Sequence, residues 1–159
     1  MNEQAASLLF PELGPAYRNL TPWVEALLRF VCGAAMIPHG LRAVFGFFPG
    51  SGRVSSFADT KKMLASRGFR PGAFWAYVLA LVQFVAGPFL ALGLFTRPAA
   101  LVCFLFLAAI SFDRNRTGGY FWNKQGFEYP MVWAVICLFF AVAGGGRISI
   151  DNLILRFAF

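Results

Sequence analysis

Residues 73–112 read AFWAYVLALVQFVAGPFLALGLFTRPAALVCFLFLAAISF, and this stretch decides the fold. Apart from Arg97 it carries no charged side chain, over a length that fits two membrane-crossing helices of about 20 residues each. Thr96 and Pro98 interrupt the stretch, and these residues are typical of a helix cap and a first helical turn. Because the connection is so short, the stretch predicts an antiparallel hairpin.

Two further apolar stretches flank this hairpin, which gives four spans at about 23–48, 73–95, 98–112 and 129–144. The spans are continuously apolar, whereas barrel strands would alternate, so helices are indicated. The last two are short and need their flanking aromatics and glycines, or a locally thinner bilayer. We expect an all-α, integral membrane four-helix bundle over residues 23–159. Residues 1–22 form a lead-in without the pattern of a cleavable signal.

The composition agrees with a membrane location. Hydrophobic residues make up 58% of the 159 residues and charged residues 13%, against roughly 25% charged in soluble domains. The net charge of +7 lies mainly between the apolar stretches, where lipid headgroups attract it, so nucleic acid is not an expected partner. Cys32, Cys103 and Cys137 lie in separate apolar stretches without a C-x-x-C pair. We expect them to be small buried hydrophobes, with no disulfide framework and no zinc site.

The connections 49–72 and 113–128 share the membrane face opposite the short hairpin turn. Alternating apolar and charged residues from Val54 to Arg67, with Gly68 as a stop, predict a short interfacial helix in the first loop. Lys and Arg are more numerous in these two loops than on the other face, which favours a cytoplasmic location for both. The loop residues are Arg53, Lys61, Lys62, Arg67, Arg70, Arg114, Arg116 and Lys124, against Arg18, Arg97, Arg147 and Arg156.

The first span carries a polar stripe. At 100° per residue, Glu25, Arg29, Cys32, Met36 and His39 fall within an arc of about 80°, which should face the bundle interior. Two explanations remain open. Either Glu25 pairs with Arg29 and His39 bonds a carbonyl or a neighbouring helix, or the stripe lines a cavity for a polar or redox-active molecule.

Depth in the membrane divides the polar residues further. His39, Arg42 and Glu128 lie toward the face of the two long loops, and Gln83 is about midway along its span. Arg29 lies toward the opposite face, near Asp151, so we do not expect an Arg29–Glu128 bridge.

These positions supply the candidates for substrate binding, whereas no catalytic residue and no metal site can be assigned. Arg29 or Arg42 would attract an anion, and the remaining roles fall to aromatic and titratable groups. The full candidate set is Arg29, His39, Arg42, Gln83, Trp122, Glu128 and Tyr129. His39 and Glu128 would handle protons, and Trp122 or Tyr129 would stack on a ring. No cofactor is evident, although a quinone would fit these roles.

Four segments together resemble the DoxX family: Arg29 to Gly40, Gly87 to Arg97, Gly126 to Pro130 and Gly144 to Asp151. The resemblance implies a four-helix protein of bacterial cytoplasmic membranes. Some relatives are subunits of thiosulfate:quinone oxidoreductase, others are linked to complexes handling thiol and oxidative stress, and distant ones assist assembly or trafficking.

The resemblance also aligns single positions. It matches Arg29 to the family's arginine in the first helix and Glu128 to its acidic start of the fourth. The family usually has Glu where this chain has Gln83, and a neutral amide cannot accept a proton there.

Two functions follow as hypotheses, and the sequence leaves open whether the protein is an enzyme. The first is a membrane subunit or accessory of a redox system that binds a quinone or a small sulfur-containing anion within the bundle. The second is a non-enzymatic scaffold, assembly factor or small-solute carrier that engages a partner through its basic loops. A cavity lined by His39, Gln83 and Glu128 would favour the first. The partners considered are the lipid bilayer, a redox-enzyme subunit and a second copy of the chain.

Overall fold

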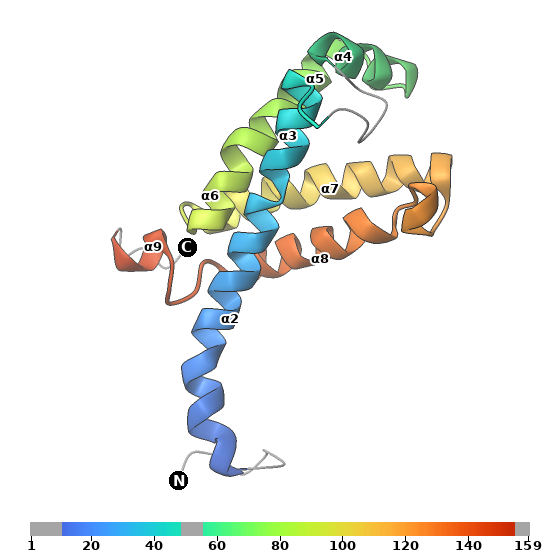
Figure 1. Cartoon of the computed structure of the whole chain (residues 1–159). Helices are drawn as coiled ribbons and strands as arrows, with labels where there is room; N and C mark the ends of the chain where they lie inside the picture. The colour runs from blue at the N-terminus through green and yellow to red at the C-terminus, as the bar shows by residue number, and fades with distance from the viewer. Residues whose placement is uncertain (1–10, 49–55, 155–159) are drawn as a thin grey trace.

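The computed structural model describes residues 11–48 and 56–154, which form helices and turns without any strand (Figure 1). The elements in chain order are η1 (Pro11–Leu13), α2 (Gly14–Ala34), α3 (Met36–Phe45), α4 (Phe57–Ser66), α5 (Gly72–Leu81), the π-helical turn η2 (Val82–Ala86), α6 (Gly87–Leu92), α7 (Thr96–Gly118), η3 (Trp122–Lys124), α8 (Glu128–Ala143) and α9 (Ile150–Leu153). The predicted all-α class is confirmed for this part of the chain.

Three apolar helical segments of the described chain are long enough to cross a bilayer: Gly14–Phe45, Gly72–Leu92 and Thr96–Gly118. The first begins at Gly14, earlier than the boundary near residue 23 that the sequence suggested. Helix α8 is apolar but has 16 residues, about 24 Å at the standard rise, against a hydrocarbon core of about 30 Å. A fourth crossing by α8 therefore stays a prediction.

The helices form two pairs. The α5–η2–α6 segment lies along α2 and α3, while α7 and α8 form a hairpin that runs across this first pair in Figure 1. Helices α2 and α6 approach closely at Gly33 and Gly87. A Cβ on Gly87 would lie only 3.0 Å from both the Gly33 carbonyl oxygen and the Met36 Cβ. Small residues at this crossing let the two backbones touch, which is how membrane helices commonly associate.

The core lies where the two pairs meet and is built mainly from small side chains. Its buried members are Cys32, Met36, Val82, Leu90, Ala99, Ala100, Cys103, Cys137 and Phe140. By contrast, Trp23, Leu27, Leu81 and Val142 each expose more than 60% of their surface. Such extensive exposed apolar surface is unusual for a soluble monomer and is expected of helices that face lipid.

Helix α4 in the first long loop confirms that this loop contains a short helix. It begins after Ser56, whose hydroxyl accepts a hydrogen bond from the Asp59 amide at 3.2 Å. It ends before Gly68, which has a φ of +93°. The buried Thr60 hydroxyl donates to the Ala43 carbonyl at 2.6 Å and ties α4 to α3. That α4 lies on the membrane surface stays a prediction.

Candidate functional site

Arg29 lies buried between three segments of the chain, with 4% of its surface exposed. Its Nη1 donates to the Gly145 carbonyl, and its Nη2 donates to the Ile148 carbonyl at 2.8 Å. Gly93, at a φ of +71°, lies against the guanidinium, since a Cβ there would be 2.6 Å from the Arg29 Cζ. Arg29 thus fixes the turn after α8 against the turn after α6. The structure has no ion pair between Arg29 and Glu25 among the residues it describes.

Asp151 caps helix α7 from the far end of the chain. Its carboxylate accepts from the Phe95 amide at 2.7 Å, the Thr96 amide at 2.8 Å and the Thr96 hydroxyl at 2.7 Å. A carboxylate at a helix N-terminus satisfies free amides and interacts favourably with the helix dipole. The expectation that Thr96 caps α7 was wrong, because Phe95 holds the cap position and Asp151 supplies the acceptor.

These contacts define what we call the latch: Arg29, Gly93, Thr96, Gly145, Ser149 and Asp151. Every hydrogen bond in it joins protein groups to one another. The latch satisfies both terminal nitrogens of Arg29, whereas its buried Nε has no hydrogen-bond partner. It also agrees with the prediction that Arg29 and Asp151 lie near the same face, away from Glu128.

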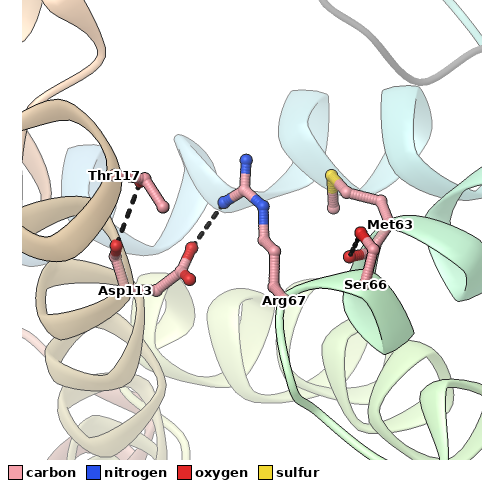
Figure 2. A network of polar contacts seen from close by, with 5 residues as sticks. All are labelled: Met63, Ser66, Arg67, Asp113 and Thr117. Carbon is pink, nitrogen blue, oxygen red and sulfur yellow. Dashed lines mark hydrogen bonds and ion pairs between the residues drawn. The ribbon is translucent and has the colours of Figure 1, made fainter.

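A second polar group lies where α4 meets α7. Arg67 at the end of α4 forms an ion pair with Asp113 of α7, whose carbonyl also accepts from the Thr117 hydroxyl at 3.0 Å (Figure 2). Arg114 is close enough to interact electrostatically with Arg67, Asp113 and Arg42, and His39 interacts with Arg42 and Arg114.

We call His39, Arg42, Arg67, Asp113 and Arg114 the basic cluster. Three guanidinium groups and one carboxylate give it a net charge of +2 when His39 is neutral. Arg42, Asp113 and Arg114 are partly buried, so water screens their charges less than it would on an open surface. His39 and Arg67 are exposed, so the site is open to solvent, and its excess positive charge favours a small anion.

Gln83 lies in the π-helical turn η2, with 6% of its surface exposed. Its Oε1 is buried and has no hydrogen-bond partner. A Cβ on Gly40 would lie 3.0 Å from the Gln83 Cβ, so Gln83 packs against α3 at Gly40. Gly40 is the residue that follows His39. Single π-helical turns are frequently found at functional sites. A buried acceptor without a partner also requires an explanation.

The remaining candidates lie at the outer end of the α7–α8 hairpin. Glu128 accepts a hydrogen bond from the Trp122 amide at 3.2 Å, and the Tyr129 ring contacts the Trp133 ring at a centroid distance of 5.9 Å. In Figure 1 this end of the hairpin lies away from α3. The structure therefore divides the seven predicted residues among four places: the latch, the basic cluster, η2 and the outer end of the hairpin. It brings His39 and Arg42 together and leaves Glu128 apart from them.

Sequence reasoning missed Arg67, Asp113 and Arg114 as members of the basic cluster. The signal that could have identified them was available, because both long loops and both adjoining helix ends were assigned to one membrane face.

The surface of the described residues includes two open hollows. One of about 360 Å³ lies between α2 and the segment before α9, beside Arg18, Trp23 and Arg147. The other, of about 340 Å³, is an apolar groove between α5–η2–α6 and α7, lined by residues that include Val82, Phe89, Phe95 and Ala99. Neither contains a predicted site residue. No group of three or more His, Cys, Asp or Glu residues within 11–48 and 56–154 could hold a metal ion.

The three cysteines meet in the core, although no sequence pattern indicated that they would. The Cys32 Sγ of α2 lies 3.4 Å from the Cys137 Sγ of α8. Cys103 of α7 belongs to the same buried core cluster as these two residues. The expectation that each is a small buried side chain is met, but they form one cluster instead of three separate contacts.

The family model for DoxX matches residues 24–116. The chain belongs to the DoxX family. The match confirms the resemblance and covers Arg29, the whole basic cluster and Gln83. This DoxX protein is also similar to an uncharacterized protein of Haemophilus influenzae, at 29% identity over 134 residues, covering 82% of this chain and 90% of that relative. No solved structure matches the chain.

Proposed function

We propose that this DoxX protein is a membrane subunit or accessory of a redox system, and that it binds a small sulfur-containing anion at the basic cluster. The observation that carries the proposal is the imbalance of charge between α3, α4 and α7. Arg67 forms an ion pair with Asp113, Arg114 interacts with the same carboxylate, and the Arg42 guanidinium adds its positive charge beside Arg114.

The chemistry of guanidinium groups fits such a ligand. Arg presents several N–H donors in a rigid plane and binds oxyanions through paired, charge-assisted hydrogen bonds. Thiosulfate and related ions carry charged oxygens around sulfur and would accept these bonds. His39 adds a group that can donate or accept a proton near the bound ion.

Gln83 extends the site toward the middle of the membrane. Its unpartnered Oε1 would accept a hydrogen bond from a ligand O–H or S–H. A quinone is the second ligand that we consider, because its reduced form carries two such hydroxyl groups. In either case the ligand would exchange electrons with a partner subunit, and the basic loops would face that partner.

The test uses the purified protein in lipid nanodiscs, with thermal unfolding measured in thiosulfate, in sulfate and in chloride at equal ionic strength. A ligand that binds the folded state raises Tm with its concentration. We expect thiosulfate to raise Tm, and a short-chain quinone tested separately reports on the second ligand.

Arg114→Gln is the diagnostic variant, and Arg116→Gln is its matched control. Both remove one charge from the end of α7, but Arg116 lies over the Phe112 ring, 4.1 Å from its centroid, outside the cluster. We expect Arg114→Gln to weaken thiosulfate binding at least tenfold and Arg116→Gln to change it less than twofold. Equal effects of the two variants, or no Tm shift with any ligand, would reject the anion site and favour the scaffold or carrier alternative.

A further inference from the structure

Three helices that lie far apart in the sequence each deliver one thiol to the same point of the core. Cys32 comes from α2, Cys103 from α7 and Cys137 from α8, and each is at most 2% exposed. The Cys137 sulfur lies 3.4 Å from that of Cys32, and Cys103 belongs to the same buried cluster. A disulfide bond is about 2.05 Å long, so small side-chain movements would join two of these sulfurs.

Packing alone does not explain the choice of residue. The same core contains Ala99, Ala100 and Ala134, which fill sites of similar size without reactive atoms. Two adjacent thiols can lose two electrons and form a bond, and a third adjacent thiol can exchange with that bond.

The apolar groove borders the buried core that contains the three cysteines. Its lining includes Val82 and Ala99, which also belong to the buried core that contains the three cysteines. Cys103 follows Ala99 by one helical turn, and helical side chains lean over the preceding turn. Cys103 does not line the groove itself, but Ala99 and Val102 of the same helix do, so we expect its thiol to be the first that a ligand there would reach. Phe89 and Phe95 give the groove aromatic surface that suits a flat apolar ring.

We propose that the three cysteines form a membrane-embedded thiol relay that delivers two electrons to a quinone in this groove. The inference rests on the proposed function only in assigning the protein a redox role, since it uses neither the basic cluster nor an anion.

The chemistry balances in two steps. First, the Cys103 and Cys137 thiols lose two protons and two electrons, an S–S bond forms between them, and the quinone becomes a hydroquinone. Second, the Cys32 sulfur attacks the Cys137 sulfur, so that the Cys32–Cys137 bond forms and the Cys103–Cys137 bond breaks. The proton of the Cys32 thiol passes to the Cys103 sulfur. The relay ends with Cys103 reduced and with Cys32 joined to Cys137.

The experiment starts from fully reduced protein in nanodiscs under anaerobic conditions. Decylubiquinone is added, samples are quenched in acid and denatured, and free thiols are alkylated before mass spectrometry. We expect one alkylated thiol in place of three, a linked peptide pair containing Cys32 and Cys137, and about one hydroquinone per protein. Cys103→Ala should slow disulfide formation by the quinone at least tenfold. Cys32→Ala should stop at a Cys103–Cys137 bond.

A small water-soluble thiol oxidant, diamide, provides the control arm. With diamide, Cys103→Ala should still form the Cys32–Cys137 disulfide at nearly the wild-type rate. Three alkylated thiols in wild-type protein after quinone treatment would overturn the relay, whatever diamide does. Failure of the anion site appears separately, as the loss of the thiosulfate-induced Tm shift, and leaves the alkylation pattern unchanged.

Discussion

Gly93 is the residue at which the latch depends most directly on a missing side chain. It ends α6 in the left-handed region and lies against the Arg29 guanidinium. An L-residue there would meet both backbone strain and a steric conflict with a buried charged group.

Gly93→Ala should therefore lower stability by more than the strain alone, which is about 1–2 kcal/mol. Gly68→Ala is the control, because Gly68 also has a positive φ, +93°, and no atom within 4 Å of the added Cβ. Thermal unfolding in the same nanodiscs should give a clearly larger drop in Tm for Gly93→Ala. Similar decreases in Tm for the two variants would show that the Arg29 side chain moves away from the added methyl group at little cost.

At Gln83, by contrast, we expect one substitution to raise Tm. Replacing it with Met keeps the volume and removes a buried acceptor without a partner, a feature that costs about 1–3 kcal/mol. Gln83→Met should raise Tm in ligand-free protein, whereas Gln83→Ala should lower it by leaving a cavity. A lower Tm for Gln83→Met would mean that the amide is satisfied in the folded protein.

Among the elements, α7 is unusual in having its N-terminus completed by Asp151, which follows it by more than thirty residues. Asp151→Ala would free two amides and a hydroxyl in a buried site. Loss of a cap costs about 0.5–2 kcal/mol, and buried bonds to a charged group raise the cost further.

We expect Asp151→Ala to reduce Tm strongly and to expose the segment 144–154 to proteolysis. Asn152→Ala, one residue away on an exposed position, should leave both measurements near wild type. Resistance of the Asp151→Ala segment to protease would contradict the role of the latch in holding it.

The contact between α4 and α7 joins stability to ligand binding. Asp113 neutralises part of the basic cluster and holds Arg67. Asp113→Asn would raise the cluster charge from +2 to +3, so thiosulfate should bind more tightly even though α4 is held less firmly. Titration of the Tm shift with thiosulfate measures this gain, and weaker binding would exclude the cluster as the anion site.

Sequence patterns predicted these elements well where one residue type controls the outcome. Continuous apolar runs located the helices, and Gly68 ended α4 as expected. That Arg29 lies near Asp151 followed from the depth of the two residues in the membrane. The meeting of the thiols did not follow, because it depends on how each helix is rotated. Contacts such as Gly33 with Gly87 set that rotation and join distant segments.

For the whole molecule, the unequal distribution of Lys and Arg predicts its orientation, with loops 49–72 and 113–128 in the cytoplasm. Lys124 and Arg147 are both exposed and were assigned to opposite faces. In a background with the native cysteines replaced by Ala, Lys124→Cys should react with an impermeant maleimide only in inverted vesicles. Arg147→Cys should react only in intact cells. The reverse labelling pattern would show that the protein has the opposite orientation.

The dependence of α7 on Asp151 also has a consequence for biosynthesis. A ribosome makes α7 long before it makes the acceptor that completes the start of that helix. The insertion machinery must therefore hold an unfinished hairpin turn, with free amides, until residue 151 has been translated. A nascent chain that stops short of Asp151 would keep that polar end exposed, and cellular quality control could recognise it as incomplete.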